Sequence, residues 1–508
     1  MTMIRLDGMG LSLEDVERIA HASNVSVELS DDARTRMQAS RDVVERKVAS
    51  GEVVYGVTTG FGRLADVSIP PGRRTELQHN LVRSHASGMG DPLPQPMVRA
   101  LMTLRANALA RGVSGCRVGV VDHLLELLNR RIHPRVPEFG SVGASGDLAP
   151  LAHVALALLG EGRVEHAGQW HDAGDVLSEE GLDPLTLDSK EGLALINGTQ
   201  ATTGIGILAL LRAERALATA SVAAAMSLDA LMGTPAAFRA EIHEARPHEG
   251  QIESARLMRR LLDGSEIRES HREDDPRVQD AYALRCVPQV HGAARHALAY
   301  VRGILETEAN SATDNPLIFA EADVVVSGGN FHAQIVSQAL DLLAIAVADL
   351  AAISERRIER LLNPDLSMGL PAFLAAEPGL ESGFMIAQVT AVDLLAELRV
   401  LAHPASVDSV TTSANQEDHV SMGMAAARKA ERAVGCLERV LATELMCAAQ
   451  GIDYRRPLRS GAGVERAWDA LRATVSRLDG DRALGPDLDA VYAMIRTGVF
   501  ADITKEFA

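Results

Sequence analysis

The sequence predicts a mainly helical fold, and three observations support that prediction. Aromatic residues make up only 3% of the 508 residues, and much of the 47% hydrophobic content is Ala, Leu and Val. Several long stretches place apolar residues three and four positions apart, which is the period of a helix. Small aliphatic side chains with this spacing favour closely packed helices over a β-sandwich.

The N-terminal third mixes short elements. Apolar and polar residues alternate over 25–29, which predicts a short strand, and a helix is expected over 31–50, ending at Gly51. Helices are expected over 95–130. A small hairpin is expected over 163–171, around a central Ala-Gly pair.

Beyond about residue 200, long Ala- and Leu-rich stretches predict long helices. These are expected over 202–231, 292–309, 335–362, 385–402 and 422–449. Small residues on several faces indicate a bundle that also packs against other subunits, because a lone chain would expose too much apolar surface. We therefore expect two parts: an N-terminal domain over 1–196, then a long-helix bundle and C-terminal helical region over 197–508.

The most apolar stretch, 335–353, carries Asp341 and Asp349, so it is expected to be buried against protein and not lipid. The charge-dense stretch 253–280 is expected to be mostly a solvated connection.

Overall charge argues against two classes of partner. Fifty Lys and Arg against 68 Asp and Glu give a formal charge of −18. Such a surface repels phosphate groups, so neither nucleic acid nor a membrane is an expected partner. Four cysteines without CxxC spacing suit a reduced compartment, and the first residues lack a secretory pattern, so a cytoplasmic location is expected.

The lysines and histidines argue against several cofactors. No lysine lies in a Gly-Lys-Ser/Thr context, and none is a good Schiff-base candidate, so neither a nucleotide nor pyridoxal phosphate is expected. His243-Glu244 and His248 do not have HExxH spacing, and Pro247 interrupts the helix, so no metal is expected.

The most informative stretch is 140–150, GSVGASGDLAP. Its glycines have GxxGxxG spacing and not the GxGxxG of a dinucleotide site, and Asp147 occupies the last position of a GxSxG elbow. From the residues alone, Ala-Ser-Gly here is compatible with an ordinary tight turn.

A second interpretation is chemical. If the turn presses the Gly146 nitrogen against the Ala144 carbonyl, a five-membered ring can close with loss of water. Glycine has no Cβ to block that approach. Loss of the Ser145 hydroxyl as a second water leaves 4-methylideneimidazol-5-one (MIO), an electrophile that needs no metal or added cofactor.

The segment 140–153 strongly resembles the prosthetic-group segment of the histidine-specific members of the aromatic amino acid ammonia-lyase family. Other stretches resemble that family in the same order. They are YGVTTGFG at 55–62, SHASG at 84–88, NGTQ at 197–200, QDAYALRC at 279–286, DNP at 314–316, GNFHA at 329–333 and NQEDH at 415–419. The similarity covers nearly the whole chain, and several ordered motifs are far more specific than one tripeptide.

The resemblance implies an aromatic ammonia-lyase fold, with an N-terminal part that holds the prosthetic group and an extended central helical bundle. It implies a homotetramer whose active sites are shared between subunits. It also implies a reaction, the removal of ammonia from L-histidine to give trans-urocanate, which is the first step of histidine degradation. The cofactor would be MIO, formed autocatalytically from Ala144, Ser145 and Gly146.

The resemblance assigns roles to individual residues, and each has a structural alternative. Tyr55 would be the base for the β-proton, with Tyr282 as the competing base or a tyrosine satisfied in a helical interface. Asn197 would donate a hydrogen bond to the ring oxygen, or cap a helix. Arg285 would grip the substrate carboxylate, or form a structural salt bridge. Phe331 would pack beside the prosthetic group, or in the core.

Substrate choice would depend on two places. The pair Ser84-His85 and the downstream Glu417 would face the imidazole, since a carboxylate accepts from a ring N–H and a histidine can pair with the other nitrogen. Gln279 and Gln416 would support the polar network. Ala283 and Gln334 depart from residues that are frequent in the family, which bears on kinetics more than on the reaction.

Three rival functions remain at this level. A phenylalanine or tyrosine ammonia-lyase, or an aminomutase, belongs to the same family and differs at the selectivity positions. A fumarase or aspartase relative would need a GSSxMPxKxN-type loop, and no lysine has that context. A non-catalytic helical oligomer would not need Ala144-Ser145-Gly146, Tyr55, Tyr282 and Arg285 together.

Overall fold

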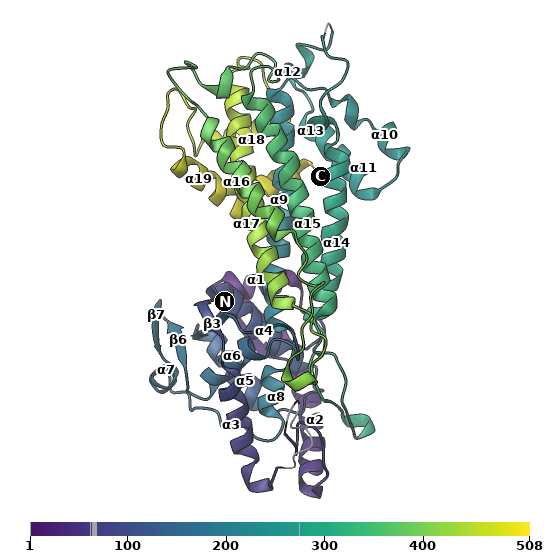
Figure 1. The fold of residues 1–508 in the computed structure, drawn as a ribbon, viewed down its shortest axis with the longest axis vertical. Coiled ribbons are helices and arrows are strands. Elements are labelled where there is room, and N and C mark those ends of the chain that lie inside the picture. Colours follow the sequence, from purple (N-terminus) through teal and green to yellow (C-terminus); the bar gives the residue numbers. More distant parts are fainter. Residues whose placement is uncertain (1, 61, 63–68, 274, 508) are drawn as a thin grey trace. The chain divides into compact units, whose positions relative to one another are not determined.

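Helices dominate the computed structural model, which describes residues 2–60, 62, 69–273 and 275–507. Strands are few and short, as Figure 1 shows. The predicted mainly helical fold is therefore confirmed.

The chain divides into two compact units, each built from three stretches of sequence. The first unit comprises Met1–Leu208, Val301–Asp341 and Pro404–Arg428, and the second comprises Ala209–Tyr300, Leu342–His403 and Lys429–Ala508. The predicted functional division after residue 196 stays a prediction.

The first unit begins with a two-stranded parallel sheet. Strand β1 (Thr2–Leu6) pairs in register with β2 (Val25–Leu29), and helix α1 (Leu13–His21) connects them. Helices α4 (Gln95–Ala110) and α5 (Val118–Asn129) pack nearby. The strand expected over 25–29 is confirmed, whereas β1 has no counterpart among the predicted elements.

Helix α2 (Asp31–Ser50) has the predicted bounds, and its two ends have clear causes. The Ser30 hydroxyl accepts from the Ala33 N–H at 3.2 Å and caps the first turn. Gly51 ends the helix in the left-handed conformation, with φ of 74°.

Short elements complete the first unit. Its further helices are α3 (Arg74–His85), α6 (Leu148–Leu158), α7 (Ala173–Glu179) and α8 (Glu191–Ile196), with 3-10 turns η2 (Pro71–Arg73), η4 (Ala320–Ala322) and η6 (Ser413–Asn415). The antiparallel pairs are β3 (Met89–Pro92) with β5 (Pro137–Phe139), β4 (His133–Pro134) with β6 (Arg163–His166), β6 with β7 (Gln169–Asp172), and β8 (Leu317–Phe319) with β9 (Val324–Val326). The pair β6–β7 confirms the predicted hairpin.

Five long helices confirm the predicted helical stretches. They are α9 (Gln200–Ala230), α14 (Val287–Ala309), α15 (Gln334–Leu362), α16 (Met385–Leu401) and α17 (Gly423–Asp453). Helix α14 begins five residues earlier than expected, because Pro288 is tolerated in a first helical turn. Helix α15 ends before Asn363-Pro364, as predicted.

Buried charges tie three long helices together in the second unit. Arg357 of α15 donates to both carboxylate oxygens of Glu444 on α17, at 2.5 and 2.8 Å, and both side chains are fully buried. Ser227 of α9 also donates to Glu444, at 2.7 Å. The carboxylate thus satisfies donors from two other helices, which fixes their register.

Smaller helices complete the second unit. They are η3 (Pro235–Phe238), α10 (Ala240–Glu244), α11 (Glu249–Leu261), α12 (Glu266–Glu269), α13 (Tyr282–Arg285), η5 (Ala372–Leu374), α18 (Ala462–Arg472), α19 (Gly485–Arg496) and α20 (Val499–Phe507). The expectation of a mostly solvated connection over 253–280 is wrong for its first part, since α11 buries Ala255, Leu257, Met258 and Leu261 on one face.

Helix α15 is long and apolar enough to cross a membrane by length and composition alone. However, 61% of its most apolar window is buried within the protein. Asp341 lies in that helix, 3% exposed, and its carboxylate accepts from the Ser406 N–H at 2.7 Å. These features agree with the prediction of a helix buried against protein.

Breaking the buried pair should destabilise the second unit strongly. Arg357→Gln leaves the Glu444 charge buried without its main partner, and we expect a loss of about 3–5 kcal/mol. Arg432→Gln is the control, because it removes an exposed ion pair with Glu397 and should change stability by about 1 kcal/mol or less. Chemical denaturation followed by circular dichroism measures both, and equal losses would contradict the assignment.

Candidate active site

The Ala144-Ser145-Gly146 tripeptide lies between β5 and α6, and close backbone contacts hold it. Gly146 pairs with Gly198 in an isolated parallel bridge, and the Asp147 N–H donates to the Gly198 carbonyl at 2.6 Å. Gly146 has φ of 74°, and a Cβ at this position would lie 2.3 Å from the Gly198 oxygen. Only glycine therefore fits at position 146.

Asn197 binds the centre of the tripeptide. Its side-chain Nδ2 donates to the Ser145 carbonyl at 2.8 Å and to the Ser145 hydroxyl at 2.9 Å. Behind it, Arg105 is 1% exposed and donates to the Asn197 carbonyl at 2.7 Å. Burial lowers the pKa of Arg105, and its Nε and Nη2 atoms have no hydrogen-bond partner among the described residues.

The Asp147 carboxyl anchors the other end of the loop. It accepts from the N–H and the hydroxyl of Thr202 on α9, at 2.8 and 3.0 Å, and from the Ser141 hydroxyl at 3.1 Å. Complete burial raises its pKa to about 6, and these hydrogen bonds oppose that shift. The Met422 N–H also donates to the Val142 carbonyl at 2.9 Å, so chain from beyond residue 400 supports the loop.

A cavity of about 710 Å³ opens beside Ser145. Its walls come from Tyr55, Gly60, Gly62, Ile69, Leu77, Asn80, Leu81, Ser84, His85, Ser145, Leu148, Leu193, Ile196, Ser413, Ala414 and Glu417. Every one of these residues belongs to the first unit. The walls combine aliphatic side chains with several polar groups, which is typical of a site for a small organic molecule.

Hydrogen bonds define the tautomer of His85, which lines this cavity. Its Nδ1 lies 2.8 Å from the Leu81 carbonyl and 3.0 Å from the Ser84 hydroxyl. A carbonyl only accepts, so Nδ1 carries the proton and Nε2 of the neutral ring is an acceptor. Burial lowers the pKa of His85, while the Leu81 hydrogen bond and the nearby Glu417 charge oppose that shift.

Glu417 is held by Thr412. The Thr412 hydroxyl donates to Oε2 of Glu417 at 2.8 Å, and the two residues exchange backbone hydrogen bonds at 2.8 and 3.3 Å. The Thr412 hydroxyl contacts Oε2 of the carboxylate and not Oε1, so the two oxygens differ in their surroundings. Tyr55 also lines the cavity, and its phenolic oxygen accepts from the Gly62 N–H at 3.4 Å.

The first unit brings most of the expected site residues together. Tyr55, Ser84, His85, Ser145 and Glu417 line one cavity, and Asn197 contacts Ser145 directly. Ala144 and Gly146 flank Ser145 in the same loop. The expected lid segment 55–62 is a loop where it is described, and Phe61 lies outside the described residues.

Apart from Ala144, Gly146 and Asn197, which adjoin Ser145, five expected residues do not line the cavity. Gln279, Tyr282 and Arg285 belong to the second unit, whereas Phe331 and Gln416 belong to the first. Tyr282 is 69% exposed, and the Arg285 guanidinium carbon lies 4.4 Å from the centre of its ring. Tyr282 is therefore available to another surface, whereas Arg285 beneath it is only partly exposed.

Several supporting residues were not predicted from the sequence. They are Arg105, Thr202, Thr412 and the carboxyl of Asp147 as an anchor. Asp147 lies inside the Gly-rich motif, and a charged residue directly after Ala-Ser-Gly could have indicated its role. Arg105 and Thr412 carry no pattern that spacing reveals.

Comparison with known proteins identifies the family of the chain. A family model described as aromatic amino acid lyase matches residues 11–473. The chain belongs to the aromatic amino acid lyase family. Among members of this family, the histidine ammonia-lyase of Koribacter versatilis is 51% identical, and the match covers 99% of each chain.

Two solved structures of aromatic amino acid lyase relatives have the same fold. A histidine ammonia-lyase from Trypanosoma cruzi is 44% identical with a TM-score of 0.93, covering 100% of this chain and 96% of its own. A tyrosine aminomutase from Streptomyces globisporus is 39% identical with a TM-score of 0.94, covering 99% of both chains. The predicted family and fold class are thus confirmed.

The buried Asp147 should give stability a distinctive pH dependence. Its pKa is raised in the folded chain, so the folded state holds a proton that the unfolded state has released between about pH 4 and pH 6. Asp147 therefore adds stability as the pH falls through about 6, by up to about 3 kcal/mol.

Asp147→Asn removes this titration. We expect the loss of stability relative to wild type to be larger at pH 5 than at pH 7.5, measured by chemical denaturation at both values. A difference that stays constant across this range would contradict the assignment.

Proposed function

We propose that this chain removes ammonia from L-histidine without oxidation, giving trans-urocanate. One observation carries the proposal: Ser145 lines the same cavity as His85 and Glu417. The first residue belongs to the tripeptide expected to form the prosthetic group, and the other two belong to the expected imidazole site. The relatives named histidine ammonia-lyase support the same substrate.

The residues present fit an MIO group formed from Ala144, Ser145 and Gly146. The tripeptide lies in a tight loop where no Cβ fits at position 146, and Asn197 donates to the Ser145 carbonyl. When formed, the group supplies an electrophilic carbon and an electron sink. Asn197 would hold its oxygen through Nδ2, which stabilises negative charge on that atom.

His85 and Glu417 would hold the substrate ring. Glu417 accepts a hydrogen bond from one N–H of a protonated substrate imidazole, and Nε2 of His85 accepts from the other ring N–H. Phenylalanine and tyrosine have no ring nitrogens to use these groups, so they leave polar atoms unsatisfied in a partly buried cavity. That penalty favours histidine.

Tyr55 is the proposed base. Its phenolic oxygen lies on the cavity wall and takes the β-proton, while the amine leaves from the neighbouring carbon. The products are the trans-acrylate and ammonia, and no electrons are gained or lost overall. The aliphatic wall from Leu77, Leu193 and Ile196 keeps water away from the reacting carbons.

The remaining predicted residues would come from neighbouring subunits. Arg285 would bind the substrate carboxylate through its two parallel N–H groups, beside Tyr282. Gln279 would come with them, and Phe331 and Gln416 would complete the polar and apolar surroundings. We propose a homotetramer in which residues of more than one chain form each site.

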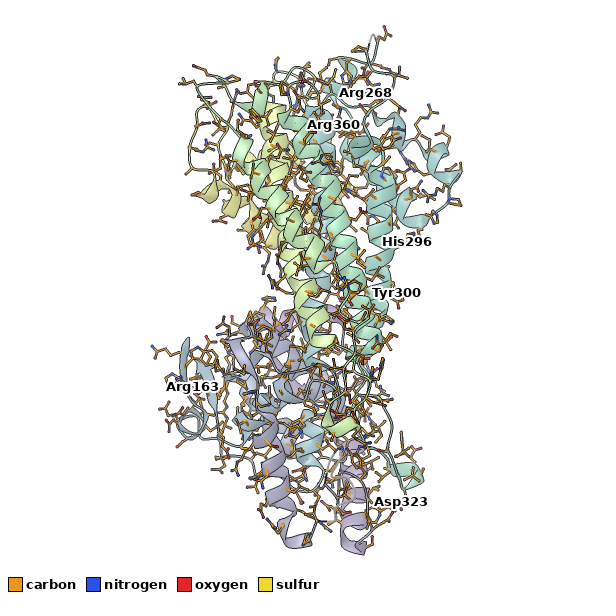
Figure 2. All side chains as sticks on the ribbon, viewed as in Figure 1. Arg163, Arg268, His296, Tyr300, Asp323 and Arg360 are labelled. Atoms are coloured by element: carbon orange, nitrogen blue, oxygen red, sulfur yellow. The ribbon has the colours of Figure 1, made fainter. Side chains whose placement is uncertain are left out.

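Exposed apolar side chains support this assembly. Helix α16 exposes Ile386, Val389, Val392 and Val400 by 43–70% in the single chain. On α14, Tyr300 is 51% exposed (Figure 2). Apolar surface of this kind needs a partner in a stable protein.

The location and domain roles follow from the same proposal. All four cysteines are free and three are buried, which supports a reduced cytoplasmic setting. Residues 1–196 would carry the MIO-forming loop, and residues 197–508 would form the long-helix bundle and C-terminal region.

Absorbance of urocanate tests the proposed reaction directly. We expect turnover of L-histidine and little or none of L-phenylalanine and L-tyrosine. Glu417→Ala should lower kcat/KM for L-histidine at least about tenfold, because a charge-assisted hydrogen bond to the ring is lost. Glu321→Ala, an exposed acid of the same unit, should leave activity unchanged.

Three results would contradict the proposal. One is a β-amino acid product, which would indicate an aminomutase. Another is histidine turnover that survives Glu417→Ala intact. A third is an active polypeptide whose intact mass equals that calculated from the sequence, since MIO formation removes two water molecules.

Mixing inactive variants tests whether sites are shared. Ser145→Ala removes the hydroxyl needed for MIO, and Arg285→Ala removes the guanidinium proposed to bind the substrate carboxylate from another chain. Co-expression should recover about a quarter of wild-type activity if subunits mix at random, because some sites then combine two intact contributions. Recovery should be absent if one chain supplies both residues, which would overturn the shared-site proposal.

A further inference from the structure

We infer that Thr412 is a positioning residue that orients Glu417 for recognition of the substrate ring. This inference rests on the proposed function, and it assigns a role to a residue outside the expected imidazole site. The Thr412 hydroxyl donates to Oε2 of Glu417 at 2.8 Å. Thr412 does not itself line the cavity, whereas Glu417 does.

The backbone makes this contact well defined. Thr412 and Glu417 form an isolated antiparallel bridge, with hydrogen bonds of 2.8 Å from Thr412 N to Glu417 O and 3.3 Å in the other direction. Between them, η6 turns the chain back, with Ala414 at φ of 51° and Asn415 at φ of 68°. The bridge places the two side chains opposite each other, so the hydroxyl reaches the carboxylate without ordering a flexible loop.

The contact distinguishes the two carboxylate oxygens. Oε2 accepts the Thr412 hydroxyl, so Oε1 is the oxygen that we assign to the substrate N–H. A glutamate side chain otherwise samples several rotamers, and fixing it before binding reduces the entropy lost when substrate binds. Thr412 thus acts on recognition of the ring and not on the transferred proton.

The neighbouring Thr411 gives a matched control. Its hydroxyl donates to Oδ1 of Asn415 at 2.8 Å, in an exposed contact within the same loop. Thr411→Val and Thr412→Val make the same chemical change at adjacent positions. Only the second removes a hydrogen bond to Glu417.

Steady-state kinetics on the full-length enzyme test the inference. Thr412→Val should raise KM for L-histidine about five- to tenfold with little change in kcat, because ground-state and transition-state binding of the ring weaken together. Thr412→Ser keeps the hydroxyl and should restore KM to within about twofold of wild type. Thr411→Val should match wild type.

Inhibition by two acrylates separates ring recognition from general damage to the loop. In Thr412→Val, trans-urocanate should inhibit more weakly by the same factor as the KM change, whereas trans-cinnamate, which has no ring nitrogen, should inhibit as in wild type. Equal weakening for both compounds would show a merely structural role and overturn the inference. A Thr412→Val enzyme with unchanged KM would also overturn it.

Failure of the inference and failure of the proposed function give different results. If wild type does not turn over L-histidine, the proposed function is wrong. If wild type is active and Glu417→Ala is impaired while Thr412→Val equals wild type, only the role of Thr412 is wrong. Should Thr412→Val fold poorly, Thr412→Ala with the same two inhibitors provides the comparison.

Discussion

Contact between two glycine backbones is the constraint on which the rest of the site depends. Gly146 lies so close to the Gly198 backbone that position 146 has no room for a side chain, and the side chains of Gln200 and Arg105 crowd position 198. This contact aligns the tripeptide with the segment before α9, so the Asp147 N–H meets the Gly198 carbonyl and the Asn197 amide meets Ser145. Arg105 and Thr202 then hold that alignment from behind with buried hydrogen bonds.

Main-chain and neighbouring hydroxyl groups fix the polar side of the cavity. The Leu81 carbonyl sets the proton on Nδ1 of His85, and the Thr412 hydroxyl occupies one oxygen of Glu417. Neither His85 nor Glu417 needs a charged partner to stay in place. Both groups therefore keep hydrogen-bonding capacity for a bound molecule, which is the property that a selective site requires.

The sequence predicted the helical architecture well because the long Ala- and Leu-rich stretches have a clear helical period. It missed β1, since only Ile4 and Leu6 of its five residues are buried and the alternation is too short to stand out. The sequence predicted a mostly solvated connection over 253–280, and this was wrong for the part in α11 because its apolar residues are interspersed among many charges. Short or mixed patterns carry too little information to predict burial.

Residues of the candidate site were predictable where a family motif contains them, and not where a single tertiary contact gives them their role. Tyr55, His85, Ser145 and Glu417 lie far apart in sequence, yet the family motifs identified them and the first unit gathers them around one cavity. Tyr282 and Arg285 belong to the second unit and do not line that cavity, and a sequence motif alone does not give this placement. Arg105 and Thr412 were missed because single buried polar contacts depend on tertiary packing and have no periodic signal.

The backbone support of the Gly-rich loop has a consequence for how the protein matures. Val142 receives its hydrogen bond from Met422, and Gly146 meets Gly198, so segments separated by as many as 280 residues must dock before the loop has its final shape. Contacts this distant form slowly, because the entropy of closing a long loop must first be overcome. A cyclisation that needs a compressed loop would therefore occur only after the first unit has folded. The electrophile would then be present only in chains that had folded correctly.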